Sequence, residues 1–379
     1  MKIARIATVP FFLYSHLREQ IAATAAAGHE IVLISSAGPE TEWLRTIPGV
    51  RFTEIDIPRK IAPLRDLRAL WRLFLFFRRE RFDIVHSTTP KAGMLCAVAG
   101  WLARVPIRLH TFTGQAWVEL GGMARLLAKG GDWLTAHLDT QCYADSFSQR
   151  DFIVSEAVGT AKHIHVLRAG SLAGVDLARF DLDRWAGGRV ALRRALNIPE
   201  GAKVIAFVGR LTRDKGMGEL MAAFNQVSAQ LPCVLLLIGP NETADGSLSH
   251  AAGQGQDENV RLVGYTPEPE RYLAISDLLC LPSYREGFGN VVIEAAAMGV
   301  PSVGTDIVGL RDAIVNGETG VLVPPRDVAS LAEAMLALLT DDARRRTMGE
   351  RARQRAVSAY DAATVNAAVL AEYRRLAGR

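Results

Sequence analysis

The sequence contains few cysteines and no cluster of them. Its four cysteines are Cys96, Cys142, Cys233 and Cys280. They are far apart in mostly apolar surroundings and have neither metal-ligand spacing nor the spacing of a disulfide framework, which suits a reducing cytosol. The chain also lacks a signal-like apolar segment at its start and any uninterrupted apolar run of about 18 residues. We therefore expect neither a secretory leader nor a transmembrane helix.

Other features are missing as well. The net charge of +4 over 379 residues is too small to indicate nucleic-acid binding. The segment after the first predicted strand, residues 8–16, has no glycine, so it cannot form the Gly-x-Gly-x-x-Gly phosphate loop of a dinucleotide-binding oxidoreductase. There are no internal repeats and no low-complexity tracts. A chain of this length and of ordinary globular composition usually forms two domains.

Short apolar strands alternate with helical segments along the chain. In the first half the predicted strands cover residues 2–8, 30–35, 82–86, 107–111 and 140–144. In the second half they cover residues 203–210, 234–239, 260–265, 277–281 and 301–306. Alternation of this kind predicts an α/β fold, in which parallel sheets are covered by helices on both faces.

The most informative stretch is Glu286-Gly-Phe-Gly-Asn-Val-Val-Ile-Glu294, which lies between a predicted strand and a predicted helix. A helix that starts after a glycine-rich turn directs free N–H groups towards an anion, and the glycines allow close approach of a ligand. We expect Asn290 to cap the helix. Glu286 then lies in the turn, and Glu294 lies on the first helical turns. A carboxylate on each side of an anion pocket suits a nucleotide sugar, although two glutamates at this spacing also occur by chance.

The longer string from Tyr284 to Pro301 resembles the signature of retaining glycosyltransferases of family four, which have the GT-B fold. The resemblance implies that Glu286 binds hydroxyls of the transferred sugar and that Glu294 binds the ribose hydroxyls. It also implies that the backbone of the turn holds the sugar and the phosphates. The expected donor contacts within the turn and the helix start are Phe288, Gly289, Asn290 and Val291.

Two cations come earlier in the same half of the chain. Arg210 follows Gly209 at the end of a predicted strand, and Lys215 comes just before a predicted helix. A leaving nucleoside diphosphate gains negative charge, which fixed cations stabilise. A lysine at a helix start can also be a simple solvated residue, but in the family the equivalent Arg and Lys contact the diphosphate. We therefore assign Arg210, Lys215 and Glu286 as catalytic residues, with Arg213 as a third possible cation.

The resemblance also assigns Gly209, Gly264 and Tyr265 to the donor site. Gly264 and Tyr265 end the predicted strand 260–265, whose end lies beside the nucleotide base in relatives.

Three loops follow predicted strands of the first half, within residues 8–16, 86–90 and 110–117, and each contains a histidine and hydroxyls. In such sheets ligands bind beyond the carboxyl ends of the strands, although any one histidine there is more often a structural residue. The string Thr113-Gly-Gln-Ala-Trp117 resembles family members that build bacterial surface polysaccharides. His110 matches the position at which relatives contact the donor sugar or the acceptor. The expected acceptor site is formed by His16, His110, Thr113 and Gly114.

Residues 10–13 depart from the family pattern, because Pro-Phe-Phe-Leu replaces a glycine pair that approaches the donor phosphates in many relatives. This replacement indicates an apolar path for the acceptor.

Residues 59–81 form a predicted amphipathic helix. Its apolar side chains are Leu64, Leu67, Leu70, Trp71, Phe74 and Leu75, with Phe76 and Phe77 widening that side. An adjacent row contains Arg65, Arg68, Arg72 and Arg79. The apolar face either packs on the sheet, with solvated arginines beside it, or rests on an anionic bilayer; both arrangements are compatible in one helix.

We expect an N-terminal acceptor-binding Rossmann-like domain over residues 1–180 and a C-terminal nucleotide-sugar-binding Rossmann-like domain over residues 181–358. A final helix, residues 359–379, returns to the N-terminal domain, and GT-B relatives have the active site in the cleft between the domains. Residues 170–194 are interpreted as the connection, and residues 245–258 as an exposed loop. The Asp181-Leu-Asp183 string lies in that connection, away from the motifs, and is not interpreted as a metal site.

The predicted function is a retaining glycosyltransferase for bacterial surface-glycan assembly. It moves a hexose or N-acetylhexosamine from a UDP-sugar to a polyprenyl-diphosphate-linked saccharide. We expect no cofactor and no metal, because side-chain cations face the diphosphate. The expected partners are the donor, the lipid-linked acceptor and the inner-membrane surface, without nucleic acid, and the expected location is cytoplasmic, peripheral on the inner face of the cytoplasmic membrane. The alternatives are a sugar-nucleotide epimerase of the same fold, a glycosyltransferase with a soluble acceptor and a non-catalytic sugar-binding protein.

Overall fold

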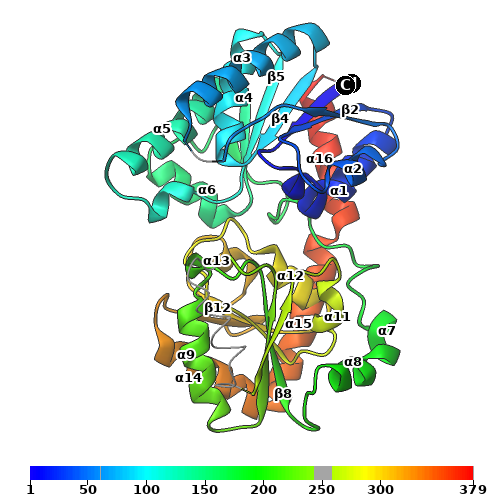
Figure 1. Ribbon diagram of the computed structural model, residues 1–379, viewed down its shortest axis with the longest axis vertical. Helices are drawn as coiled ribbons and strands as arrows, with labels where there is room; N and C mark the ends of the chain where they lie inside the picture. The colour runs from blue at the N-terminus through cyan, green and yellow to red at the C-terminus, as the bar shows by residue number, and fades with distance from the viewer. Residues whose placement is uncertain (60, 243–257, 379) are drawn as a thin grey trace. The chain divides into compact units, whose positions relative to one another are not determined.

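A computed structural model describes residues 1–59, 61–242 and 258–378 of the chain. It divides into two compact units (Figure 1). Unit 1 contains residues 1–174 together with 362–379, and unit 2 contains residues 175–361. Nearly all of the loop predicted over residues 245–258 falls outside the described residues.

Unit 1 is built on a seven-stranded parallel sheet with the order β3-β2-β1-β4-β5-β6-β7. The strands are β1 (Lys2–Ile6), β2 (Glu30–Ser35), β3 (Val50–Glu54), β4 (Ile84–Thr88), β5 (Ile107–Phe112), β6 (Gln141–Ala144) and β7 (Ile164–His165). The strand order reverses between β1 and β4, and ligands of such sheets bind at the carboxyl ends of the strands near this point.

Both faces of this sheet are covered by helices, and most residues of its central strands β1, β2 and β4 are buried. One face packs on α1 (Pro10–Ala26), α2 (Thr41–Arg45) and α16 (Ala362–Leu376). The other packs on α3 (Pro63–Glu80) and α4 (Pro90–Leu102), and α5 (Gly122–Leu138) lies beside α4. Helix α6 (Phe147–Ser155) follows β6, and the short helix η1 (Ala116–Glu119) precedes α5.

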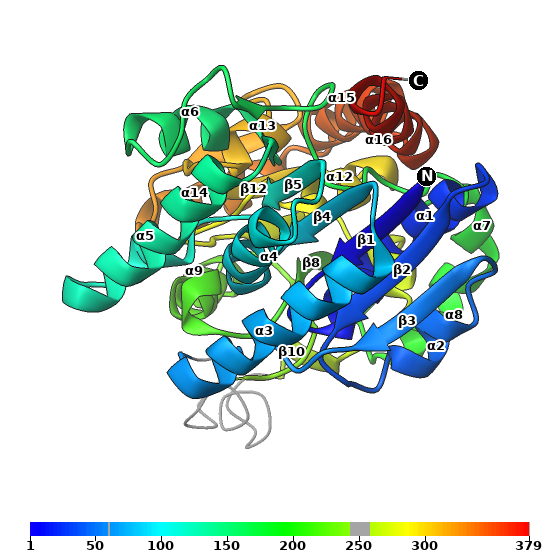
Figure 2. The same ribbon diagram turned by 90° about the horizontal axis from the view of Figure 1, so that it is seen from above.

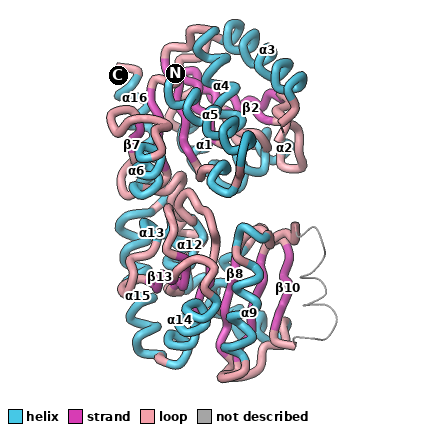
Figure 3. Tube along the Cα trace, turned by 90° about the vertical axis from the view of Figure 1, so that its left-hand side faces the viewer, coloured by secondary structure: helices cyan, strands magenta, loops and turns pink. Residues whose placement is uncertain are grey.

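Unit 2 contains a six-stranded parallel sheet with the order β10-β9-β8-β11-β12-β13. The strands are β8 (Lys203–Val208), β9 (Cys233–Ile238), β10 (Val260–Gly264), β11 (Leu278–Leu281), β12 (Ser302–Thr305) and β13 (Gly320–Val323). Their helices are η3 (Arg213–Lys215), α9 (Met217–Ser228), α11 (Pro269–Leu273), α12 (Asn290–Ala297), α13 (Leu310–Ala313), α14 (Val328–Thr340) and α15 (Asp342–Tyr360). Helix α9 packs on α14, and α12 packs on α15. Figure 3 shows strands and helices alternating along this unit.

The segment after β1 differs from the prediction. The expected loop over residues 8–16 is short, because α1 begins at Pro10. Proline favours the first position of a helix, where its fixed φ fits and no N–H is needed. Leu13, Leu17 and Ile21 then point to the sheet at helical spacing and are buried. His16 therefore lies on a helix and not in a loop.

Residues 170–194 also contain more structure than expected. Helices α7 (Leu182–Trp185) and α8 (Arg189–Ala195) occupy its second half, with the short helix η2 (Ala186–Gly188) between them. The side chain of Asp181 accepts a hydrogen bond from the backbone N–H of Asp183 at 3.2 Å and caps α7. Helix capping therefore accounts for Asp181, the first aspartate of the Asp-x-Asp string.

Helix α3 meets the sheet with only part of its predicted apolar side, since Leu70 and Phe74 pack partly against the core beside the buried residues. The side chains that pack on the sheet are those of Ala69, Leu73, Phe76 and Phe77. The stripe of Leu64, Leu67, Trp71 and Leu75 is exposed instead. The sequence left this choice open, because the helix has apolar residues on two opposite sides and the helical period alone does not say which side meets the sheet.

Candidate functional site

Two loops of unit 2 meet beyond the carboxyl ends of β8 and β11. The backbone N–H of Tyr284 donates to the carbonyl of Asp214 at 2.9 Å. Gly216 has a φ of +71° and lies so close to Pro282 that an added Cβ would be 2.1 Å from the Pro282 carbonyl oxygen. Only glycine fits this close approach in that conformation. Glycine at position 216 therefore allows the loop after β8 to pack closely against the glycine-rich turn after β11.

This contact brings two of the predicted catalytic residues together. The Lys215 Nζ atom lies 2.5 Å from Glu286 Oε1, and both side chains are largely buried. The Ser283 hydroxyl donates to the same carboxylate oxygen at 2.8 Å. A cation and a carboxylate thus lie side by side at the edge of the sheet where ligands of α/β folds bind. The sequence did not indicate Ser283.

Arg210 reaches the same sheet edge but is less enclosed. Its guanidinium lies 3.1 Å from Glu242 and 4.0 Å from Asp214, and its side chain is 41% exposed. Arg285 lies 3.7 Å from the same Asp214 carboxylate. These pairs leave Arg210 accessible to an anionic ligand, because exposed ion pairs are weak and exchange readily.

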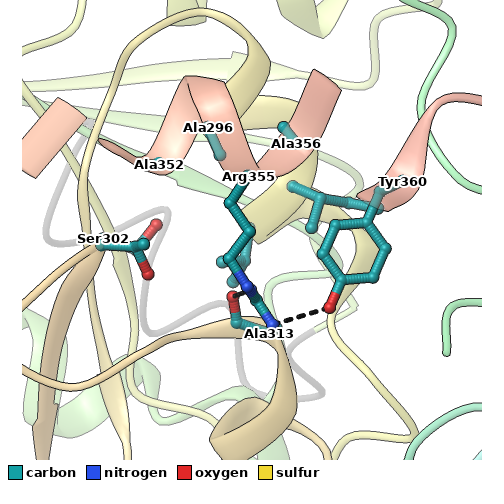
Figure 4. A pocket seen from close by; sticks show the side chains of 10 residues that line it. Ala296, Ser302, Ala313, Ala352, Arg355, Ala356 and Tyr360 are labelled. Carbon is teal, nitrogen blue, oxygen red and sulfur yellow. Dashed lines mark hydrogen bonds between the residues drawn. The ribbon is translucent and has the colours of Figure 1, made fainter. Parts of the chain in front are cut away.

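The glycine-rich turn packs against residues of α13 and α15. Phe288 is buried, with its ring 5.2 Å from that of Tyr360. Figure 4 shows Arg355 beside Tyr360 in a small pocket, where its guanidinium donates to the Tyr360 hydroxyl and to the Ala313 carbonyl, both at 2.7 Å. These contacts fix α13, whose N-cap Gly309 lies close against the turn. Any donor contact of Phe288 would therefore come from its backbone.

The N-cap of the helix after the turn lies one residue earlier than predicted. Gly289 is the N-cap of α12, with φ +89° and ψ +61°, and Asn290 is the first helical residue. The assignment of Asn290 as the cap is wrong, because the turn requires a left-handed residue at this position and glycine adopts it without strain. An added Cβ on Gly289 would also lie 2.6 Å from Leu310. Val291 follows as the second helical residue.

Glu294 lies on α12 beside a second ionic group. Arg179 donates to both carboxylate oxygens of Glu270 at 2.8 Å, and also to the Pro267 carbonyl. Burial raises the pKa of Glu294 to about 7; the positive charge of Arg179 opposes this increase and the negative charge of Glu270 adds to it. The sequence reasoning missed Arg179 and Glu270. Arg179 belongs to the string Gly174–Phe180, which resembles a family linker motif, but nothing in that string indicates its partner.

The ends of β8, β9 and β10 also lie together. An added Cβ on Gly239 would be 1.9 Å from the Gly209 carbonyl oxygen, and the Gly239 N–H donates to the Gly264 carbonyl at 2.8 Å. Tyr265 follows and is half-exposed. The predicted donor residues Gly209, Gly264 and Tyr265 are therefore neighbours at one edge of the unit 2 sheet, and their contact with the donor stays a prediction.

The histidines of unit 1 do not form one group. His110 is fully buried, with Nδ1 2.9 Å from the Ser87 hydroxyl oxygen, and it packs so closely on Gly93 that an added Cβ there would be 2.5 Å from its ring. Burial lowers the pKa of His110 to about 3, so its ring is neutral at pH 7. His86 is buried too, between Thr111 and Tyr373. Both fit the structural interpretation of such histidines.

The third histidine, His16, is exposed on α1, with its ring 5.0 Å from that of Phe12. Among the predicted acceptor residues, His16 is thus on the surface and His110 is covered by α4. A role for either in acceptor binding stays a prediction.

The loop that contains Thr113 and Gly114 is held in place by Trp117. This ring is buried and stacks on Phe152 at 5.5 Å, and its Nε1–H donates to Asp132 Oδ2 at 2.7 Å. Gly114 has a φ of +110°. The tryptophan at the end of the string therefore anchors the loop and is not available to a ligand.

Substitution Trp117→Phe is expected to destabilise the protein by about 1–3 kcal/mol, because the buried Asp132 carboxyl loses the hydrogen bond that the Trp117 indole donates. Burial raises the pKa of Asp132 to about 7 even though the Trp117 bond lowers it. Because the Trp117 hydrogen bond stabilises the charged form of Asp132, the loss should be larger at pH 8, where Asp132 is mostly ionised, than at pH 5.5, where it is mostly neutral. Urea unfolding at both pH values measures it. The matched control is Trp133→Phe, at a half-exposed position next to Asp132 on α5, and it should change stability by less than about 0.5 kcal/mol.

Comparison with known proteins now identifies the family. Residues 189–355 match the family described as "Glycosyl transferases group 1", and residues 15–170 match the one described as "Glycosyl transferase 4-like domain". A capsular polysaccharide biosynthesis glycosyltransferase, CapM from Staphylococcus aureus, is 31% identical over 341 residues, which cover 89% of this chain and 88% of that protein. The chain belongs to glycosyltransferase family four. The family predicted from the Tyr284–Pro301 string is confirmed.

Solved structures confirm the fold of this glycosyltransferase. Sucrose-phosphate synthase from Thermosynechococcus elongatus matches with a TM-score of 0.82 at 23% identity, covering 99% of both chains. Anabaena Alr3699/HepE, solved in complex with UDP and glucose, matches with a TM-score of 0.78 at 19% identity, covering 98% of this chain and 99% of that one. Two α/β units with parallel sheets and these similarities establish the GT-B fold.

Proposed function

We propose that this glycosyltransferase moves a hexose or N-acetylhexosamine from a UDP-sugar to a polyprenyl-diphosphate-linked saccharide, with retention of the anomeric configuration. The enzyme acts in the assembly of a bacterial surface glycan. It is cytoplasmic and peripheral on the inner face of the cytoplasmic membrane, and it uses neither a cofactor nor a metal. No nucleic acid takes part.

The observation that carries the donor half of the proposal is the Lys215–Glu286 pair. The 2.5 Å contact places a fixed cation and a fixed carboxylate side by side at the ligand-binding edge of a parallel sheet. A sugar diphosphate has the complementary groups, because its phosphates accept hydrogen bonds from a cation and its hydroxyls donate to a carboxylate. When such a donor binds, the ammonium group turns to the phosphate and the carboxylate to the sugar.

The chemistry follows from these roles. The bond between the anomeric carbon and the diphosphate oxygen breaks, and the acceptor hydroxyl oxygen bonds to that carbon on the same face. The acceptor proton passes to the leaving diphosphate. Lys215 and Arg210 stabilise the negative charge that develops on the leaving group. Glu286 orients the sugar and Glu294 binds the ribose hydroxyls, while Gly289 and Asn290 offer backbone N–H groups at the start of α12.

Two comparisons support the choice of substrates. One similar structure was solved with UDP and glucose, which favours a UDP-sugar donor here. The name of the relative CapM refers to capsular polysaccharide biosynthesis, which favours a surface-glycan product. The acceptor is proposed to bind unit 1 near Thr113 and Gly114, and the apolar side chain of Phe11, partly exposed at the start of α1, suits a polyprenyl chain.

The proposal is tested by incubating the protein with a panel of UDP-sugars, with and without a lipid extract, and measuring UDP release and label in the lipid phase. Lipid-dependent UDP release with one preferred sugar is the expected result. Release without lipid dependence would indicate a soluble acceptor. An altered UDP-sugar without UDP release would indicate an epimerase, and binding without any turnover would indicate a sugar-binding protein.

A further inference from the structure

Helix α3 presents an apolar stripe that faces away from the protein core. The stripe contains Leu64, Leu67, Trp71 and Leu75, and all four are exposed. Leu64 is 86% exposed and Trp71 is 58% exposed. These residues recur at helical spacing opposite the buried side chains Leu73 and Phe77. They therefore form a second apolar face that the fold itself leaves uncovered.

An arginine row runs beside this stripe. Arg65, Arg68, Arg72 and Arg79 are exposed on α3. Arg65 pairs with Asp56, and Arg79 with Glu80, but Arg68 and Arg72 have no ion-pair partner within the described part of the chain. The two acidic residues of α3 lie elsewhere on the helix: Asp66 is 2.8 Å from Lys91, and Glu80 is paired with Lys2 and Arg51. The exposed face of α3 is therefore apolar and positively charged.

Helix α5 adds a second apolar ridge that the sequence did not reveal. Residues 122–127 at the start of α5 are all exposed, and Met123, Leu126 and Leu127 are 69%, 65% and 59% exposed. Helix α4 contacts both α3 and α5, so these three helices form one layer on the same side of the unit 1 sheet. Figure 2 shows α3, α4 and α5 in this layer, with one end of α5 extending beyond α4. Trp101, at the end of α4, is exposed too.

We propose that the outer surface of α3 and the first turns of α5 form a docking surface for an anionic lipid bilayer. In-plane docking of this kind needs apolar and aromatic side chains that enter the acyl boundary, and long cations beside them that bind lipid phosphates. Trp71 and the arginine row supply both on α3. Among the described residues, no helix is long and apolar enough to cross a membrane.

The arginine row also discriminates among possible occupants. Two copies of the chain that paired symmetrically through α3 would bring the same arginines against each other, and this repulsion opposes such a dimer. An anionic bilayer complements the charge and the apolar stripe together. The inference rests on the proposed function, because a lipid-linked acceptor is what brings the enzyme to a membrane.

The test uses the full chain and vesicles of phosphatidylcholine, either alone or with phosphatidylglycerol. The wild type should cosediment with the anionic vesicles, less so at high salt, and weakly with the neutral ones. Arg68→Gln/Arg72→Gln should lower the partition coefficient on anionic vesicles by about tenfold or more. Leu64→Gln/Trp71→Gln and Leu126→Gln/Leu127→Gln should lower it as well. All six positions are exposed, so folding should be preserved, as thermal unfolding will show.

The matched control is Arg344→Gln/Arg351→Gln, which removes the same charge from exposed positions of α15 in unit 2 and should bind like the wild type. The proposal is overturned if the wild type does not bind anionic vesicles, or if the α3 and α5 variants bind like the control. It is also overturned if the wild type sediments as a dimer that Leu64→Gln/Trp71→Gln dissociates, because the surface would then be a contact between copies.

A separate assay distinguishes this inference from the proposed function. UDP release from the preferred UDP-sugar is measured with the lipid extract dissolved in detergent, where no bilayer exists. Unchanged turnover of the surface variants, together with their lost vesicle binding, supports the inference. If the wild type turns over the donor but does not bind vesicles, the proposed function stands and the docking surface is rejected. If it binds vesicles but shows no turnover, the docking surface stands and the proposed function is rejected.

Discussion

Substitution Lys215→Ala is expected to lower kcat for sugar transfer by about a hundredfold to a thousandfold. One preorganised group that stabilises developing charge contributes about this much to the rate, equivalent to about 3–4 kcal/mol of the activation barrier. The structure supports the role, because Lys215 is held at 2.5 Å from Glu286 in a largely buried position and not in solvent. The measurement is UDP release at saturating donor, in the presence of the lipid extract.

Two further variants sharpen this prediction. Lys215→Arg keeps the charge but changes its geometry, and it should restore part of the activity. Lys203→Ala removes a lysine of the same unit that pairs with the exposed Asp342 at 2.7 Å, away from the turn, and should leave kcat unchanged. If Lys215→Ala and Lys203→Ala reduce kcat equally, Lys215 does not stabilise the leaving group.

Donor binding is expected to weaken as the pH decreases through about 7, because Glu294 becomes protonated there. A carboxylate accepts hydrogen bonds from both ribose hydroxyls, whereas its neutral form has lost part of this capacity. With a pKa of about 7, only about a tenth of the molecules keep the charge at pH 6, so the Kd of UDP should rise by up to about tenfold between pH 8 and pH 6. Titration calorimetry with UDP over this range measures the change.

Glu294→Gln separates the titration of the enzyme from that of UDP itself. This variant has no carboxylate at position 294, so the part of the pH dependence that belongs to Glu294 should disappear and only the part due to the phosphate should remain. An identical pH profile for the wild type and Glu294→Gln would contradict the ribose role of Glu294.

Arg179 should move the midpoint of this titration. Its positive charge lowers the pKa of Glu294, while the neighbouring Glu270 raises it, so Arg179→Met should shift the midpoint to higher pH. The variant also leaves the buried Glu270 carboxylate without its partner, which costs stability. Arg179→Lys keeps the charge near Glu294 and should move the midpoint less.

Arg271→Met is the matched control for Arg179. Arg271 lies on the same helix as Glu270 and pairs with Glu268 at 3.3 Å, but it is half-exposed. It should alter neither the midpoint nor the affinity. A shift of the same size in both variants would mean that Arg179 acts only through the general charge of unit 2.

Local patterns were sufficient for much of this molecule. The alternation of apolar strands with helices predicted parallel sheets, because strands buried on both faces are apolar throughout. The string Glu286–Glu294 predicted a strand, a turn and a helix in the right order, because glycines and helix-forming residues act over a few positions. The family followed from the longer string Tyr284–Pro301, which resembles the family signature.

Some local details were beyond those patterns. Gly289 and not Asn290 caps α12, because the path of the turn requires a left-handed residue there. Pro10 starts α1 where a loop was expected, although proline favours that position. In both cases the residues allowed two local conformations, and only the structure showed which one the backbone adopts.

The sequence by itself determined the fold class and the family, and it led to the prediction that Lys215, Glu286 and Glu294 bind the donor, because these inferences rest on short stretches of the chain. Only the tertiary structure brought Lys215 against Glu286, placed Arg179 and Glu270 beside Glu294, and covered His110 with α4. It also decided which of the two apolar sides of α3 meets the sheet. These outcomes depend on contacts between residues far apart in the chain, and the helical and strand periods carry no information about such contacts.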